Sequence, residues 1–171
     1  TITLPDGKGT KNSFMGWQCI TSPTSTQYKL REKAGQKFDN NGYGKIKGRY
    51  TVATTTTYGN VGDYIDVKRA DGSTLKAIIA DIKNQNDAGC NKWGHLNGDC
   101  VTEFVVDKNK WYGNNAHDGA KIMNSTSPGN NSSAVTSITN QGSFFDGGGG
   151  FGKGTKTSKA KSYNARSNGS N

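Results

Sequence analysis

The sequence predicts a mainly β domain with one or two short helices, followed by a disordered, Gly-rich basic tail. Four runs rich in β-branched and aromatic residues follow one another between positions 49 and 106. Asp71 and Gly72 lie between two of these runs, which is a strong signal for a β-hairpin. With 30% hydrophobic residues and 24 glycines in 171 residues, we expect one domain with a modest core, plus flexible ends.

The N-terminal part precedes the predicted sheet. Residues 1–13 are polar and Gly-rich, and we expect them to form an arm or loop. The apolar, aromatic run Phe14–Ile20 should pack against the domain. Residues Thr26–Ala34 are predicted to form a short helix, because Ser or Thr can cap its start and Gly35 can end it.

The predicted strands are Arg49–Thr57, Tyr64–Arg69, Thr74–Asp81 and Cys100–Val106. The third strand ends on Asp81 just where its apolar character stops. Burial of a carboxylate has a desolvation cost, so an acid at this point is either functional or a cap at the strand end. Both interpretations remain open from the residues alone.

A long polar loop follows the third strand and holds many of the candidate functional side chains. Carboxylates in different environments can divide into acid and base roles. Trp93 suits stacking against a sugar, and His95 lies beside it; alternatively, Trp93 covers the end of the sheet and His95 bonds locally. The titratable groups in and around this loop are Asp81, Asp87, His95, Asp99 and Glu103.

The C-terminal third is rich in Gly, Asn and Ser. Within it, Ala134–Asn140 is predicted to form a last short helix that ends near Gly142. We therefore expect a folded domain over residues 14–146 and a flexible Gly/Ser/Lys-rich tail over residues 147–171. The first residue is Thr1 rather than Met, so we expect a processed chain or a piece of a longer protein.

Three cysteines leave two arrangements open. Cys90 and Cys100 bracket a Gly-containing loop and are candidates for a disulfide, which would leave Cys19 unpaired. A zinc site built from Cys90, His95 and Cys100 is the alternative, but it lacks a fourth ligand and the usual spacing. We expect neither a metal nor a cofactor.

The formal net charge of +9 indicates an anionic partner, such as nucleic acid, an anionic lipid surface or an anionic bacterial wall. Nucleic acid is disfavoured, because the aromatic residues are not interleaved with the basic ones and no RNP-like or zinc-finger motif is present. No apolar run reaches the ~20 residues that would span a membrane. A simple solvated basic tail remains the alternative for residues 147–171.

Three motifs carry a resemblance to a known family. They are VGDYIDV (Val61–Val67), ADGS (Ala70–Ser73) and AIIAD (Ala77–Asp81), with Glu103 in the later strand VTEFVVD. Together they resemble the double-psi β-barrel of cell-wall domains: the three-aspartate domain, the rare-lipoprotein-A-like domain and the barrel of the membrane-bound lytic transglycosylase A family. The second acid here is Glu instead of Asp, and Ile82-Lys83-Asn84 follows the first acid in place of the family's Gly-rich sequence.

The resemblance implies a six-stranded double-psi β-barrel and cleavage of the β-1,4 bond of peptidoglycan glycan strands. A longer stretch, about Phe14–Tyr112, is similar to modules of phage tail and conjugative-element wall lysins, which implies action outside the cell or on a virion tail, beside other lysin domains. In the related transglycosylases one acid protonates the leaving oxygen and then takes the sugar 6-hydroxyl proton. The residues implied are Asp81 as that acid, Asp87 or Glu103 as a second carboxylate, and Trp93, His95 and Tyr58 as substrate contacts.

Two other functions remain open. The chain could be a non-catalytic wall-binding or tail structural module, because a fold does not determine a function. It could also be a cysteine amidase or endopeptidase with Cys19 as nucleophile and His95 or His117 as base, since FMGWQC resembles the start of the CHAP amidases. That chemistry requires Cys19 at the start of a helix, and the following Ile-Thr-Ser-Pro disfavours a helix there.

Overall fold

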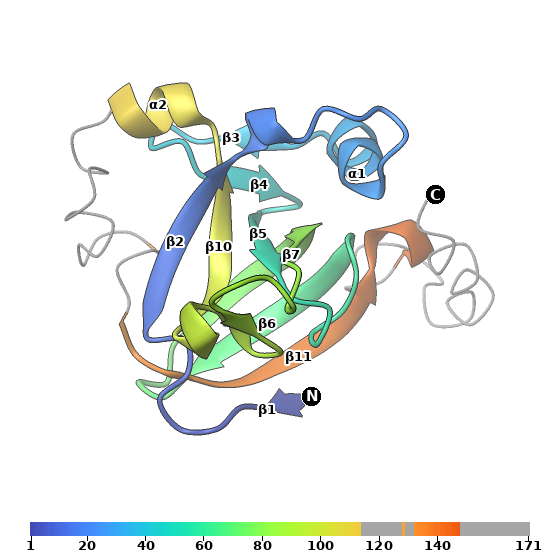
Figure 1. Ribbon diagram of the computed structural model, residues 1–171. Coiled ribbons are helices and arrows are strands. Elements are labelled where there is room, and N and C mark those ends of the chain that lie inside the picture. The colour runs from blue at the N-terminus through green and yellow to red at the C-terminus, as the bar shows by residue number, and fades with distance from the viewer. Residues whose placement is uncertain (114–127, 129–131, 148–171) are drawn as a thin grey trace.

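The computed structural model describes residues 1–113, 128 and 132–147, and in this part the chain forms a strongly curled mixed β-sheet with short helices at its margins (Figure 1). The two α-helices of the described residues are α1 (Thr26–Ala34) and α2 (Lys108–Gly113). Short 3-10 turns are η1 (Trp17–Cys19), η2 (Leu96–Gly98) and η6 (Phe144–Asp146). The strands are β1 (Ile2–Thr3), β2 (Lys11–Gly16), β3 (Lys37–Phe38), β4 (Gly44–Ile46), β5 (Arg49–Thr54), β6 (Asp63–Arg69), β7 (Thr74–Ile82), β8 (Cys90–Asn91), β9 (Gly94–His95), β10 (Cys100–Val106) and β11 (Val135–Ser143).

The strand order is β1-β11-β6-β7-β5-β10-β9-β8, with β2 added beside β10 and β4 beside β5. Two of the pairs are parallel, β5 with β7 and β2 with β10, and the other pairs are antiparallel. The prediction of a mainly β fold with short helices is confirmed. In the described part of the chain, no helix combines the length and the apolar character needed to cross a membrane.

The hairpin between β6 and β7 forms where the Asp-Gly signal predicts it. The amide of Arg69 donates to Ser73 O at 2.9 Å, and Asp71 Oδ1 accepts from the amide of Ser73 at 2.9 Å. Gly72 has φ +88°, a conformation that glycine adopts without the strain other residues incur. Local turn chemistry therefore determines this part of the sheet.

Helix α1 also begins and ends as predicted. The Ser25 side chain accepts a hydrogen bond from the amide of Tyr28 at 3.1 Å, which satisfies one unpaired donor of the first turn. Gly35 ends the helix in the left-handed conformation, with φ 69°. Leu30 is the buried residue of this helix, and it packs in a cluster with Ile46, Ile78 and Val105.

Two elements differ from their predictions. Residues 1–13 are not a loose arm, because β1 pairs with β11, β2 pairs in parallel with β10, and Leu4 is buried. Ala134–Asn140 is not a helix: β11 starts at Val135, pairs along β6 and buries Val135 and Ile138 (Figure 1). Val, Thr and Ile fit a pleated surface well, and pairing with a distant strand overrides the local helix signal.

The strand β10 runs through the centre of the molecule, and all of its residues are buried. The larger core cluster combines aliphatic side chains with several aromatic rings. In it the Tyr43 ring meets the rings of Phe104 and Trp111 edge-on, at 5.2 and 5.0 Å between centroids. The second cluster includes Val105 and packs under α1. Side chains on β10 are therefore held rigidly, which matters because Glu103 lies on this strand.

Of the expected flexible tail, residues 148–171 lie outside the described residues, and so does His117.

Candidate functional site

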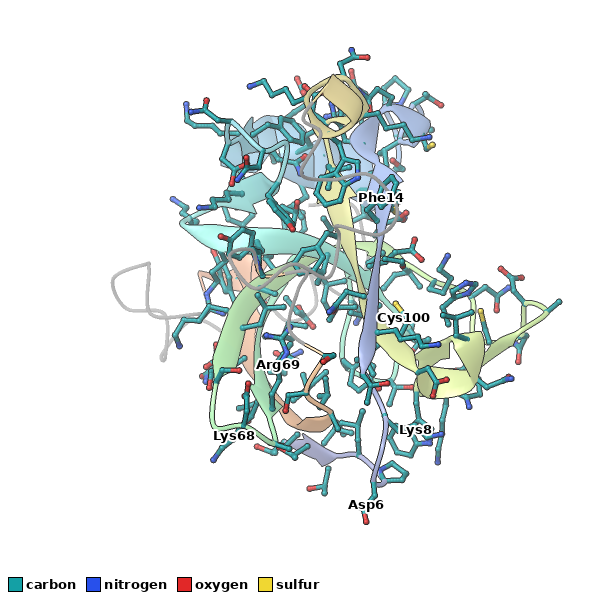
Figure 2. The ribbon with its side chains drawn as sticks, turned by 90° about the vertical axis from the view of Figure 1, so that its left-hand side faces the viewer. Asp6, Lys8, Phe14, Lys68, Arg69 and Cys100 are labelled. Carbon is teal, nitrogen blue, oxygen red and sulfur yellow. The ribbon has the colours of Figure 1, made fainter. Side chains whose placement is uncertain are left out.

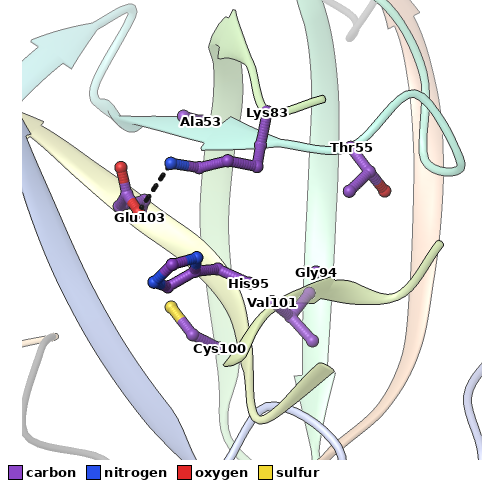
Figure 3. Close-up of a pocket in the computed structure, with 8 residues that line it drawn as sticks. All are labelled: Ala53, Thr55, Lys83, Gly94, His95, Cys100, Val101 and Glu103. Atoms are coloured by element: carbon purple, nitrogen blue, oxygen red, sulfur yellow. Dashed lines mark ion pairs between the residues drawn. The ribbon is translucent and has the colours of Figure 1, made fainter. Parts of the chain in front are cut away.

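Glu103 is a buried carboxylate in the middle of β10, with 9% of its surface exposed. Its Oε2 accepts a hydrogen bond from Ser13 Oγ at 3.0 Å and lies 3.3 Å from Lys83 Nζ. Ser13 comes from β2, which runs parallel to β10 with Ser13 opposite Glu103. Lys83 comes from the segment directly after β7. Three distant parts of the sequence thus meet at one carboxylate, and Figure 3 shows two of them, Lys83 and Glu103.

A small pocket opens beside Glu103, between β5, β9, β10 and the segment after β7 (Figure 3). The empty space among its lining atoms, counted together with the part open to solvent, is about 170 Å³, and none of it is wide enough for a water molecule to enter. A large ligand would therefore lie across its mouth instead of entering it. The lining residues are Ala53, Thr55, Lys83, Gly94, His95, Cys100, Val101 and Glu103.

Asp81 lies on the opposite side of β5 from Glu103. Both acids are register partners of Ala53, Asp81 from β7 and Glu103 from β10. The pairing of β5 with β7 shifts register between Val52 and Ala53, so that Ala80 of β7 is an extra residue just before Asp81. Asp81 Oδ1 accepts hydrogen bonds from Gln27 Nε2 at 3.0 Å and from the amide of Ile82 at 2.9 Å. Its carboxylate is therefore tied to α1, and it is not among the pocket residues.

Asp87 is exposed in the turn that precedes β8. Its backbone shapes this turn: its amide donates to Asn84 O, and its carbonyl accepts from the amide of Cys90, at 3.1 and 3.0 Å. The structure does not bring the Asp87 side chain into the pocket.

The β8–β9 hairpin is fastened to the loop after β5 by three hydroxyl groups. Tyr58 Oη donates to Trp93 O at 2.7 Å, and Thr55 Oγ1 donates to Lys92 O at 2.7 Å. Thr57 Oγ1 donates to the same carbonyl of Lys92 at 2.5 Å. Tyr58 is only 2% exposed, and burial raises the pKa of its phenol. Tyr58 was expected to contact substrate; in the structure its ring lies in the core and its hydroxyl holds the hairpin.

Trp93 is half-buried and packs against the core cluster that contains Tyr43, Phe104 and Trp111. Lys92 Nζ lies 4.7 Å from the centroid of its ring, a cation–π distance. Of the three expected substrate contacts, His95 lines the pocket and Trp93 lies near it on the same hairpin. Tyr58 holds that hairpin through its hydrogen bond to Trp93 O.

His95 lies between Cys90 and Cys100, since it is the register partner of Cys90 on β8 and of Cys100 on β10. The expected Cys90–Cys100 disulfide is not formed, and all three cysteines of the chain are free. Strands lie about 4.8 Å apart, so two strands of separation put the Cα atoms near ~10 Å, beyond the reach of a disulfide. Nowhere in residues 1–113, 128 and 132–147 do three His, Cys, Asp or Glu side chains form a metal-binding group, so the zinc alternative gains no support.

Cys90 and Cys100 have different environments. Cys90 is partly exposed, and its Sγ lies 3.6 Å from His95 Nδ1. Cys100 is 2% exposed, lies 3.3 Å from Ser13 Oγ, and donates to Thr102 O at 3.3 Å. Burial raises the pKa of the Cys100 thiol to about 11, so this thiol stays protonated at neutral pH.

The pairing of Cys19 with His95 is not formed. Cys19 is exposed at the end of η1, and the nearest helix, α1, starts only at Thr26. His95 pairs with Cys100 at the start of β10, whereas Cys19 follows the far end of β2, where Gly16 is opposite Val106. Figure 2 shows the separation through Phe14 and Cys100, which lie toward opposite ends of these two strands. The other proposed base, His117, lies outside the described residues.

Sequence reasoning missed Lys83 and Ser13. No local signal placed Lys83 beside Glu103: alternation along the strand would put Lys83 on the same face as Asp81, which instead bonds to Gln27. Ser13 had no local signal either, since it reaches Glu103 only through the parallel pairing of β2 with β10.

No protein-family model matches this chain, and neither the curated proteins nor the solved structures yield a match.

Proposed function

We propose that this protein cleaves the β-1,4 bond of bacterial peptidoglycan glycan strands, as a lytic transglycosylase-like enzyme outside the cell or on a virion tail. The observation that carries the proposal is Glu103, a buried carboxylate on a rigid strand, at the wall of a pocket, beside a lysine. General acid–base catalysis requires a carboxyl group in a partly dry site within reach of the substrate oxygen. Glu103 takes the role that the family resemblance implied for Asp81.

The proposal includes a double-psi β-barrel as the finer description of the curled sheet. Its support is the mixed topology: β5 pairs in parallel with β7, β2 pairs in parallel with β10, and β5 and β10 are themselves neighbours. Asp81 and Glu103 then flank the same residue, Ala53, from the two sides.

The proposed reaction starts from the Lys83–Glu103 ion pair. An anionic group of the wall polymer draws the Lys83 ammonium away, and the lysine can follow because its side chain is 28% exposed. The Glu103 carboxylate then takes up a proton from solvent and gives this proton to the leaving glycosidic oxygen. In the second step its carboxylate takes the proton of the sugar 6-hydroxyl as the anhydro ring closes, so that one residue acts first as acid and then as base.

His95 and Trp93 are proposed as the substrate contacts, because the first lines the pocket and the second adjoins it on the β8–β9 hairpin. In this proposal the glycan lies across the mouth of the pocket, with the edge of one sugar facing Glu103. The net charge of +9 favours association with the acidic polymers of a wall.

The test is digestion of purified peptidoglycan by the wild-type chain and by the variants Glu103→Gln, Asp81→Asn and Asp87→Asn, with products identified by mass spectrometry. The matched control is Glu32→Gln, an acid with a 62% exposed side chain on α1. We expect anhydro-muramyl products that disappear in Glu103→Gln and persist in the control. If activity survives in Glu103→Gln but is lost in Asp81→Asn or Asp87→Asn, the assignment of the acid to Glu103 is wrong.

A non-catalytic wall-binding module is the second candidate, and one observation favours it. Both acids already have protein partners, Glu103 with Ser13 and Lys83, and Asp81 with Gln27. A binding module would sediment with insoluble peptidoglycan and release no soluble fragments. Sedimentation unchanged in Glu103→Gln, with no products from any variant, would select this candidate.

A further inference from the structure

The β8–β9 hairpin carries a second arrangement of reactive groups, in which His95 contacts a thiol that glycan cleavage does not use. Antiparallel pairing places Cys90 directly opposite His95, so the two side chains project from the same face of the hairpin. The distance from Cys90 Sγ to His95 Nδ1 is 3.6 Å, within the range of a sulfur hydrogen bond. A neutral imidazole protonated on Nε2 presents Nδ1 as an acceptor for the thiol proton.

Each of the other two thiols lacks one feature that Cys90 has. Cys19 is exposed but lies at the far end of β2 from His95, and Cys100 lies beside His95 but is buried. Cys90 alone among the three combines partial exposure with an imidazole within hydrogen-bonding distance. This combination is the one that makes cysteines reactive in proteins.

We propose that Cys90 is an activated thiol and the site at which this protein is covalently modified by small disulfides, with His95 as the proton acceptor. The imidazole takes the proton from Sγ, and the thiolate attacks one sulfur of the disulfide. The S–S bond of the reagent breaks, a mixed disulfide forms on Cys90, and the leaving thiolate takes up a proton. No oxidant besides the disulfide itself is required, since one S–S bond replaces another.

The charged side chains near His95 have partners of their own, so they leave its contact with Cys90 in place. Lys83 and Glu103 share the pocket with His95 but are paired with each other, and Lys92 lies over the Trp93 ring. The buried Cys100 is also separated from Cys90 by β9, so it is not placed to displace the mixed disulfide. At this site the reaction should therefore stop at one equivalent, the mixed disulfide on Cys90, as long as the protein is folded.

The probe is 4,4′-dithiodipyridine, whose released thiopyridone is followed by absorbance at a single neutral pH. In Cys19→Ser the accessible thiol is Cys90, and in Cys90→Ser it is Cys19. The buried Cys100 is present in both variants and contributes the same background reaction. We expect Cys19→Ser to release one equivalent at least about tenfold faster than Cys90→Ser does, the scale on which a neighbouring base changes thiol reactivity. Mass spectrometry of the peptides should place the adduct on Cys90.

Two further measurements test the role of His95. In the Cys19→Ser background, His95→Asn should remove the roughly tenfold advantage while circular dichroism remains unchanged. If that variant does not fold, unfolding both Cys→Ser variants in urea replaces it. Urea exposes Cys100 equally in the two variants, so the rates of Cys90 and Cys19 should then become equal. Equal rates in the folded proteins, or an advantage that persists in folded His95→Asn or in urea, would overturn the proposal.

Discussion

Lys83 Nζ lies 3.3 Å from Glu103 Oε2, and this ion pair joins the end of β7 to the centre of β10 across the strand between them. The two side chains are 28% and 11% exposed, so the pair is neither fully solvated nor sealed from water. Ser13 completes the arrangement from β2. The contacts with Lys83 and Ser13 that hold the Glu103 carboxylate in place also determine whether it can exchange a proton with a substrate.

Removal of the Glu103 charge should destabilise the fold as well as alter function. Glu103→Gln leaves the Lys83 ammonium without its partner in a site that is only partly hydrated. We expect a loss of about 1–2 kcal/mol in the free energy of unfolding, measured in urea. Lys83→Met alone should cost a similar amount, and the double variant should cost less than the sum of the two. Additive losses would show that the pair contributes no coupling energy.

Gly94 should be intolerant of any side chain. It has φ +154°, and a Cβ there would collide with the backbone of Cys100 on the neighbouring strand. Gly94→Ala must push β9 away from β10, so we expect a loss of at least about 2 kcal/mol. Gly72→Ala is the matched control, because Gly72 also has positive φ but open space around it, and it should cost about 1 kcal/mol. Equal losses in Gly94→Ala and Gly72→Ala would mean that backbone strain alone causes the loss, without a contribution from the collision with Cys100.

The hydroxyl of Tyr58 should control the mobility of the β8–β9 hairpin. Tyr58→Phe removes the hydrogen bond to Trp93 O and leaves that carbonyl without its donor. The expected cost is about 1 kcal/mol, with faster amide hydrogen exchange in the hairpin than in β10. Tyr28→Phe, on the partly exposed face of α1, serves as the control and should leave exchange in the hairpin unchanged. If amide hydrogen exchange in the hairpin is unchanged in Tyr58→Phe, the Tyr58 hydroxyl does not control the mobility of the hairpin.

Acid should destabilise the protein partly through Asp66. Partial burial of this carboxylate acts to raise its pKa, but hydrogen bonds from Gln141 and Arg49 and the charges of Arg49 and Lys76 outweigh burial and lower the pKa overall. A depressed pKa in the folded state gives stability that is present above the unfolded value, about 3.9, and is lost as the pH falls through the folded value.

Urea unfolding of wild type and Asp66→Asn between pH 7 and pH 2.5 measures this contribution. The stability advantage of the wild type over Asp66→Asn should be constant above about pH 5 and should shrink below about pH 4. A difference that stays constant down to the lowest pH would show that Asp66 does not titrate with folding.

The sequence by itself determined the features that depend on neighbouring residues. Ser25 and Gly35 cap α1, Asp71 and Gly72 form the hairpin, and Cys100–Val106 is the strand its composition predicts. These follow from hydrogen bonds and backbone preferences that operate over a few positions. The mainly β fold and the candidate acids Asp81 and Glu103 were accessible for the same reason.

Only the tertiary structure decided which groups meet. Ser13 and Lys83 reach Glu103 through pairings between distant strands, and β9 separates Cys90 from the cysteine that the sequence suggested as its disulfide partner. Val135–Ser143 becomes a strand because β6 and β1 lie on its two sides, which outweighs its local helix signal. Register and strand order are long-range properties, and a one-residue slip in register would exchange the two faces of a strand, so local patterns do not determine them.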